Sequence, residues 1–282
     1  MDIFHNYIKE LFPYFEDKIS IKYGIINNMI DNPYKSTPYY SISKKQFYIN
    51  IPNISKYLIK SSEEILIEPY LNTSDEDIKF FLIETVIPIY FLQNGFICLK
   101  GTAIVKDNKI IIITGYGFGK STLTYKLIQK YDYRLITDNY IVLNNKKIIN
   151  SFNMSIWGDI ISKIEYNKTE LKPIRKNLDK YFILHDKYNL SGNEKILDIY
   201  ILNKHFSDKV YINDVKNIDK PISLFNCLMG ETLINSNDSM KEYFSKLVNI
   251  SNDSNIKIIF SSNKMNELDN IYEIFEQIKI NI

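Results

Sequence analysis

Residues 110–122, with the sequence IIIITGYGFGKST, join a run of isoleucines to a glycine-rich turn that ends in Gly-Lys-Ser-Thr. Isoleucine is β-branched and favours a strand, whereas glycine reaches backbone angles that other residues avoid. Successive N–H groups in such a turn can surround an anion. Lys120 would reach the β and γ phosphates of a nucleotide there, and the Ser121 hydroxyl would bind Mg²⁺. The segment therefore predicts a strand that leads into a phosphate-binding loop.

An amphipathic helix is expected to begin at this lysine, because Leu123 and Leu127 lie four residues apart and share one helix face. Its positive N-terminal end would face the phosphates. The loop departs from the pattern G-x-x-x-x-G-K-[ST]: Thr114 stands where the pattern has its first glycine, or the loop counted from Gly115 is one residue short. The predicted nucleotide-binding residues are Gly115, Tyr116, Gly117, Phe118, Gly119, Lys120, Ser121 and Thr122.

The strand before the loop is predicted to be the second arm of a β-hairpin. Residues 96–99 and 102–105 favour the first arm, Asp107 and Asn108 favour a turn, and residues 109–114 form the second arm. This arrangement differs from the common phosphate-loop folds, in which the loop follows an isolated parallel strand.

A second apolar strand is predicted over residues 133–143, followed by a tight turn at 144–147 and another hairpin. It would carry Asp138 to the edge of the sheet where the phosphate loop lies. An acid at that edge can bind a metal ion or accept the proton of an attacking hydroxyl. Asp138 is therefore a candidate for either role, and the alternative is an ordinary turn residue before Asn139.

The remaining sequence indicates two parts, a small α+β lobe over residues 1–72 and a nucleotide-binding domain over residues 73–282. In the lobe we expect a helix within residues 3–15 and strands within residues 24–30, 46–51 and 64–70. Ser74 is predicted to cap a helix that runs to residue 94, with Pro88 kinking it or ending its first part. Further on, strands are expected at residues 195–203 and 210–213, and helices at residues 221–233 and 239–249.

Composition narrows the class of protein. The 282 residues are 45% hydrophobic and 24% charged, which is typical of a globular chain. A net charge of +2, with 33 acids scattered among 35 basic residues, argues against a nucleic-acid partner. The longest apolar region, residues 80–99, is interrupted by polar residues and proline, so no membrane span is expected. Two cysteines and a start without an apolar leader predict a cytoplasmic protein.

Three segments together resemble the catalytic core of HPr serine kinase/phosphorylase: LKGTAIV at 99–105, IITGYGFGKSTL at 112–123 and YRLITDN at 133–139. That family shares its fold with phosphoenolpyruvate carboxykinase, and its wider membership includes peptide-modifying kinases of biosynthetic gene clusters. The resemblance covers roughly residues 96–145. Weaker likeness to later core elements of the family extends over residues 197–202, 256–260 and 266–278.

The resemblance implies an α/β fold, a phosphate-loop nucleotide-binding core with a mixed sheet, and ATP and Mg²⁺ as ligands. It implies that Lys120 binds phosphate, that Ser121 binds Mg²⁺, and that Asp138 is the general base or a metal-linked acid. The sequence departs from the family at two further places, where Lys100 replaces a histidine and Asn139 replaces the second of two aspartates. A lysine at position 100 could hold a phosphate as a fixed cation; the alternative is a surface lysine between strands.

The middle segment, residues 151–190, is rich in lysine and holds Arg175, one of two arginines in the chain. Because arginine grips phosphate in a bidentate way that lysine cannot, Arg175 is predicted to lie on an arm that closes over the nucleotide or the acceptor. The alternative is a solvated charged face.

The predicted function is an ATP-dependent kinase that transfers the γ-phosphoryl group to a hydroxyl acceptor, either a seryl or threonyl side chain of a peptide or protein or a small metabolite. The first alternative is a nucleotide-binding regulator of the same fold that has lost catalysis, which Lys100 and Asn139 favour. A weaker alternative is a nucleotide hydrolase. The expected partners are the nucleotide and the acceptor, and, by analogy with the family alone, further copies of the chain in a homo-oligomer.

Overall fold

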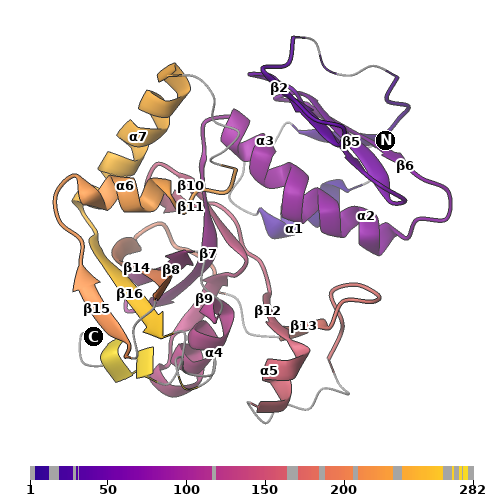
Figure 1. Ribbon diagram of the computed structural model, residues 1–282. Helices are drawn as coiled ribbons and strands as arrows, with labels where there is room; N and C mark the ends of the chain where they lie inside the picture. Colours follow the sequence, from indigo (N-terminus) through magenta and orange to yellow (C-terminus); the bar gives the residue numbers. More distant parts are fainter. Residues whose placement is uncertain are drawn as a thin grey trace.

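The computed structural model describes residues 4–12, 19–27, 30, 32–115, 119–163, 171–183, 188–205, 209–230, 237–262, 269, 273–274 and 276–278. These residues form a mixed α/β protein with a six-stranded sheet, an eight-stranded sheet and a two-stranded sheet (Figure 1).

The six-stranded sheet belongs to the N-terminal region, drawn in indigo at the upper right of Figure 1. Its strands lie in the order β1-β6-β5-β4-β3-β2 and are antiparallel except for the parallel pair β1 and β6. Their bounds are β1 Ser20–Tyr23, β2 Lys35–Ser36, β3 Tyr40–Ile42, β4 Phe47–Ile51, β5 Ser55–Ser61 and β6 Glu64–Pro69. Burial alternates along β5 and β6, so this sheet presents one apolar face to the rest of the molecule. The strands predicted at residues 46–51 and 64–70 are confirmed.

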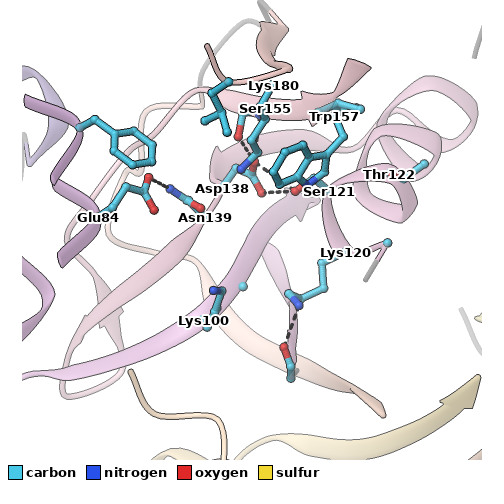
Figure 2. A pocket seen from close by; sticks show the side chains of 16 residues that line it. Glu84, Lys100, Lys120, Ser121, Thr122, Asp138, Asn139, Ser155, Trp157 and Lys180 are labelled. Carbon is cyan, nitrogen blue, oxygen red and sulfur yellow. Dashed lines mark hydrogen bonds between the residues drawn. The ribbon is translucent and has the colours of Figure 1, made fainter. Parts of the chain in front are cut away.

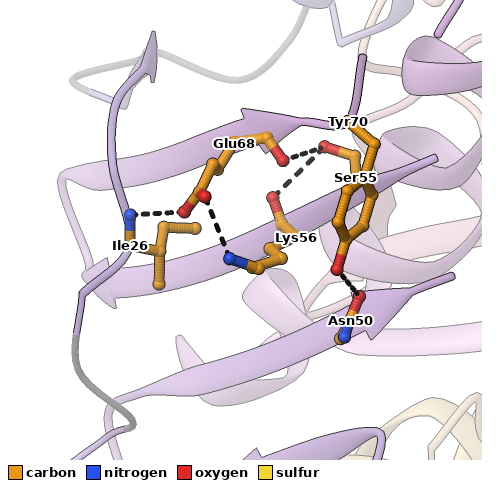
Figure 3. A network of polar contacts seen from close by, with 6 residues as sticks. All are labelled: Ile26, Asn50, Ser55, Lys56, Glu68 and Tyr70. Carbon is orange, nitrogen blue, oxygen red and sulfur yellow. Dashed lines mark hydrogen bonds and ion pairs between the residues drawn. The ribbon is translucent and has the colours of Figure 1, made fainter. Parts of the chain in front are cut away.

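The strand predicted over residues 24–30 is wrong, because residues 24–27 and 30 are irregular. The Gly24 N–H still donates to the Ile67 carbonyl of β6 at 3.0 Å, whereas the Ile26 N–H donates to a side-chain oxygen, Glu68 Oε2, at 2.7 Å (Figure 3). Glu68 also accepts a hydrogen bond from Lys56 Nζ at 2.9 Å, and this contact lowers the pKa of the carboxyl group. Nearby, Tyr70 Oη donates to Asn50 Oδ1 at 2.9 Å. The network ties the irregular segment to strand β6 through one glutamate.

A long helix lies against the apolar face of the N-terminal sheet (Figure 1). It consists of α2 Asp75–Phe81, a π-helical turn η1 Leu82–Val86 and α3 Ile87–Gln93. Ser74 caps it as predicted, accepting the Asp77 N–H at 3.1 Å. Proline has no N–H to donate to the carbonyl four residues earlier, and the π-helical turn immediately before Pro88 accommodates this loss without ending the helix. A shorter helix, α1 His5–Leu11, falls within the helix predicted at residues 3–15.

The eight-stranded sheet has the order β11-β10-β7-β8-β14-β16-β15, with β9 paired to β7. Its strands are β7 Ile97–Lys106, β8 Lys109–Gly115, β9 Arg134–Thr137, β10 Tyr140–Asn144, β11 Lys147–Ile148, β14 Lys195–His205, β15 Tyr211–Asp214 and β16 Asn255–Ser262. Strand β14 runs parallel to both β8 and β16, whereas the pairs β7–β8 and β15–β16 are antiparallel. The sheet is therefore mixed, and the predicted hairpin β7–β8 is confirmed.

Both faces of this sheet are covered, because alternate isoleucines of β8 pack in opposite directions. Ile110 and Ile112 belong to a cluster with Leu224 and Leu247, from helices α6 Asp219–Phe225 and α7 Asn237–Asn252. Ile111 and Ile113 belong to a cluster that includes residues of helix α4 Lys120–Tyr131. The uninterrupted apolar run of the sequence thus corresponds to a central strand buried on both sides.

The helix predicted at residues 221–233 ends early, at Phe225. Tertiary pairing with β7 interrupts it, since the Lys100 N–H donates to the Cys227 carbonyl at 3.2 Å and the Met229 N–H to the Cys98 carbonyl at 2.8 Å. The helix at residues 239–249 and the strands at 195–203 and 256–260 are confirmed. The predicted element at 266–278 lies mostly outside the described residues.

The position proposed for the domain boundary, between residues 72 and 73, falls in the turn between β6 and α2. One hydrophobic cluster continues across it, from Ile59 and Ile65 of the N-terminal sheet to Phe91 of the long helix and Val142 of β10. No helix in the described part of the chain is long and apolar enough to cross a membrane.

A substitution at Gly101 tests the close contact between β7 and β8. A Cβ at this position would lie 2.2 Å from the Ile113 carbonyl oxygen, which is backbone and cannot move aside. Gly101→Ala is expected to lower the free energy of unfolding by about 3 kcal/mol in urea titrations. Gly24→Ala is the matched control, because its Cβ would meet only a Leu66 methyl at 3.5 Å and should change stability by less than about 1 kcal/mol. Equal stability of the two variants would contradict the observed strand contact.

Candidate functional site

A cavity of about 480 Å³ opens at the end of β8, where the phosphate loop was predicted (Figure 2). Five parts of the chain surround it: the long helix, the middle of β7 with the end of β8, the start of α4, the residues between β9 and β10, and the small hairpin of β12 Met154–Trp157 and β13 Lys180–Ile183. The polar and aromatic side chains that line it are Phe80, Glu84, Lys100, Lys120, Ser121, Thr122, Asp138, Asn139, Ser155, Trp157 and Lys180.

The described residues of the predicted loop lie at this cavity. Gly115 ends β8 with a φ of 105°, and a Cβ there would lie 2.3 Å from the Leu202 carbonyl oxygen, so only glycine fits. Gly119 precedes α4 with a φ of 92°, and its carbonyl accepts the Leu123 N–H at 2.8 Å. Lys120, Ser121 and Thr122 form the first turn of the helix. The predicted binding residues Tyr116, Gly117 and Phe118 lie outside the described residues.

Lys120 is largely buried at the base of the cavity. Its ammonium donates a hydrogen bond to the Gly115 carbonyl at 2.7 Å. Burial lowers its pKa from 10.5 to about 8, and the positive charge of Lys100 acts in the same direction. Asp138 opposes this effect only partly. An anion in the cavity would favour the charged form of Lys120.

Asp138 lies between β9 and β10, with 1% of its surface exposed. Ser121 Oγ donates to Asp138 Oδ1 at 2.9 Å, and the Ser155 N–H donates to Asp138 Oδ2 at 3.0 Å (Figure 2). The structure therefore brings the helix hydroxyl and the strand acid together, seventeen residues apart in the chain. Both carboxylate oxygens accept hydrogen bonds, as a buried charge requires.

The chain is irregular between the end of β9 at Thr137 and the start of β10 at Tyr140, and neighbouring side chains stabilise this break. Asn139 has a left-handed φ of 78°, which interrupts the ladder. Asn150, fully buried, accepts the Val142 N–H at 2.8 Å and donates to the Tyr140 carbonyl at 2.8 Å and to Thr137 Oγ1 at 3.0 Å. The backbone groups freed by the break are thus paired by one amide.

Glu84 reaches the cavity from the π-helical turn and accepts a hydrogen bond from Asn139 Nδ2 (Figure 2). Burial raises the pKa of its carboxyl group, while Lys180, Asn139 and Lys100 act against this effect. We did not anticipate Glu84 from the sequence. Its signal was present, because it is the one acid between residues 78 and 92 of an otherwise apolar helix.

Lys100 lies on β7 opposite Tyr140, and its exposed side chain lines the cavity. The hairpin β12–β13 adds Trp157 and Lys180, which are paired in register, with Lys180 Nζ 5.8 Å from the centre of the indole ring. Neither residue is predicted in the site from the sequence, since the hairpin joins segments that are separated in the chain.

Arg175, predicted to close over the nucleotide, is not among the residues that line the cavity. Its Nε lies 3.1 Å from Asp77 Oδ1, and its guanidinium lies 5.2 Å and 5.3 Å from the ring centres of Phe80 and Phe81. In this arrangement Arg175 ties its segment to helix α2, and its charge is engaged by a carboxylate. The guanidinium contacts Asp77 and two aromatic rings here, and phosphate binding by Arg175 stays a prediction.

The donors at the cavity fit a magnesium ion that arrives with phosphates. Ser121 and Asp138 offer a hydroxyl and a carboxylate side by side, and Mg²⁺ prefers oxygen ligands, many of them from substrate phosphates and water. Within the described residues there is no group of three or more histidine, cysteine or acidic side chains that could hold a metal by itself.

Lys120 should destabilise the unliganded protein at neutral pH. The fall of its pKa from 10.5 to about 8 corresponds to about 3 kcal/mol, and a lost hydrogen bond offsets about 1 kcal/mol. Lys120→Met is therefore expected to raise the free energy of unfolding at pH 7 by about 2 kcal/mol. Between pH 8 and 10.5 the folded protein releases this proton while the unfolded chain keeps it, so wild type gains stability and the difference shrinks.

Urea titrations between pH 7 and pH 10.5 measure this difference. Lys130→Met, at the exposed end of the same helix, is the control and should leave stability nearly unchanged at every pH. A Lys120→Met variant less stable than wild type at pH 7 would contradict the assigned burial cost.

Comparison of the sequence with models of known protein families finds no match, and comparison with curated proteins finds none.

Proposed function

We propose that the protein binds ATP with Mg²⁺ and transfers the γ-phosphoryl group to a hydroxyl acceptor, as a kinase of the HPr kinase and phosphoenolpyruvate carboxykinase type. The acceptor would be a seryl or threonyl side chain of a peptide or protein, or a small metabolite. The observation that carries the proposal is the hydrogen bond of 2.9 Å between Ser121 and Asp138 at the end of β8. In phosphate-loop proteins, a loop hydroxyl and an acid from a neighbouring segment hold Mg²⁺ beside the phosphates.

The strand arrangement supports this type of phosphate-loop protein. The loop follows the antiparallel hairpin β7–β8, while the other neighbour of β8, strand β14, is parallel. The sequence segments that resemble the family correspond to this hairpin, to the start of α4 and to strand β9. The proposal of a shared fold rests on this agreement between sequence likeness and strand order.

Each polar side chain of the cavity is assigned a separate role in phosphoryl transfer. Lys120 and the N-terminal turn of α4 would stabilise the negative charge that spreads over the transferred group. Mg²⁺, held by Ser121 and Asp138, would neutralise phosphate charge when bound. Because Asp138 already accepts hydrogen bonds on both oxygens, we assign it the metal-linked role. Glu84, at the cavity wall, is the carboxylate available to accept the proton of the acceptor hydroxyl.

Lys100 would act as a fixed cation for phosphate. It is exposed to the cavity, and its charge contributes to the lowered pKa of Lys120, so the two ammonium groups lie within electrostatic reach of each other. A phosphate chain between them would relieve their repulsion.

A second candidate function is a nucleotide-binding regulator without catalysis. The observation that favours it is Asn139, whose amide donates to Glu84 where the resembling family has an acid. In this case the site would bind ATP and release it unchanged.

The first experiment is calorimetry of Mg²⁺-ATP binding to wild type, to Lys120→Ala and to Lys130→Ala as the control on the same helix. Loss of the Lys120 ammonium removes charge-assisted contacts worth about 1.5–3 kcal/mol, so affinity should fall about 10- to 100-fold. Lys130→Ala should bind as wild type does. Failure of wild type to bind would refute the phosphate-loop assignment.

Turnover separates the two functions. Mass spectrometry of peptide and small-molecule acceptors, incubated with the protein and Mg²⁺-ATP, should detect an added phosphate that is lost in Asp138→Asn. Binding without turnover across a broad acceptor set would favour the regulator, and phosphate release without an acceptor would indicate a hydrolase.

Glu84→Gln should keep ATP affinity and lower the rate of phosphoryl transfer about 100-fold or more. As a base, Glu84 acts only when deprotonated, and burial raises its pKa, so the wild-type rate should rise with pH through a range above that of an ordinary glutamate. This rise should disappear in Glu84→Gln. The matched control is Glu76→Gln, on the exposed side of α2. A wild-type profile retained in Glu84→Gln would remove Glu84 from the mechanism.

A further inference from the structure

Trp157 is the single tryptophan of the chain, and it lies in the wall of the cavity with 48% of its surface exposed. Three tyrosines, Tyr23, Tyr34 and Tyr39, are about as exposed, but none of them lines the cavity. A half-exposed indole at a polar cavity therefore leaves a broad apolar face available to a ligand.

The strand that carries Trp157 fixes which way the side chain points. Side chains two residues apart on a strand share one face. The Ser155 side-chain oxygen lies 3.5 Å from Asp138 Oδ2, so Trp157, two residues further along the strand, projects toward the same side and lines the cavity. Met154 and Ile156, on the alternate positions, belong to a buried hydrophobic cluster. Figure 2 shows the indole beside Ser121, at the start of helix α4.

The cavity has chemically different sides around its phosphate-binding centre. In the view of Figure 2, Glu84 and Asn139 lie on one side of Asp138, and Trp157 lies on the other side, as Ser121 does. An acceptor hydroxyl needs the carboxylate, whereas a nucleobase needs a flat apolar surface. The acceptor is therefore expected on the side of Glu84, and the nucleobase on the side of Trp157.

We propose that Trp157 is the platform on which the nucleobase of the bound nucleotide stacks. This inference rests on the proposed function, because it places the phosphates at Lys120 and Ser121. It makes Trp157 a residue that sets the preference for a nucleoside triphosphate over a bare phosphate chain.

Lys180 lies close to the indole in the ligand-free protein, with its ammonium 5.8 Å from the ring centre. A cation over a half-exposed ring is held weakly, and its amine lines the same cavity as the phosphate-binding residues. When the base stacks, Lys180 turns from the ring toward the phosphates. The exchange replaces a weak cation contact by base stacking and a phosphate contact.

The test compares Mg²⁺-ATP with Mg²⁺-tripolyphosphate, which carries a phosphate chain and no base. Calorimetry gives both dissociation constants for wild type, Trp157→Ala, Trp157→Phe and Lys120→Ala. The ratio of the two constants cancels differences in phosphate binding. We expect Trp157→Ala to reduce the preference for ATP about tenfold and to leave tripolyphosphate affinity unchanged. Trp157→Phe, which retains an aromatic face, should keep most of the preference.

Fluorescence supplies an independent readout, because Trp157 is the single tryptophan, and emission excited at wavelengths beyond tyrosine absorption therefore comes from it alone. ATP should quench it, and tripolyphosphate should have little effect. A preference for ATP that survives in Trp157→Ala, or equal quenching by both compounds, would overturn the stacking role while leaving the phosphate site intact. If wild type bound neither tripolyphosphate nor ATP, both the proposed function and the stacking role would be overturned.

Discussion

The carboxylate of Asp138 has almost no exposed surface, and a buried charge is stable only where hydrogen bonds replace its water. Ser121 and Ser155 provide them from two different segments of the chain. These hydrogen bonds hold the start of α4 and strand β12 against Asp138, at the break between β9 and β10. Asn150 then pairs the backbone groups that the break leaves open. The architecture of the site follows from this one acid.

The cavity concentrates opposing charges whose balance would change when an anion enters. Lys100, Lys120 and Lys180 surround it together with Glu84 and Asp138. Without a ligand, burial drives the pKa of Lys120 down and that of Glu84 up, so both groups are shifted toward their neutral forms. Such opposed shifts in one cavity are typical of functional sites. They also predict that the site costs stability in the unliganded protein.

The N-terminal region contributes to the site through the long helix. Two buried tyrosine hydroxyls hold that helix: Tyr57 Oη donates to the Ile78 carbonyl at 2.9 Å, and Tyr140 Oη donates to the Ile83 carbonyl at 3.0 Å. They attach it to the six-stranded sheet on one side and to the eight-stranded sheet on the other. Between them the π-helical turn directs Glu84 toward Asn139. The N-terminal sheet therefore supports a residue of the cavity wall as well as covering the core.

The sequence by itself determined the local elements and the central part of the site. An isoleucine run, closely spaced glycines and Lys120-Ser121 specify strand β8 and helix α4 through short-range preferences, and the apolar strand before Asp138 is equally local. Only the tertiary structure decided which distant residues join them. Glu84 and Trp157 enter the cavity, and Arg175 pairs with Asp77, because packing of separate segments sets these contacts. Periodicity describes one element at a time, whereas a binding cavity forms where several elements meet.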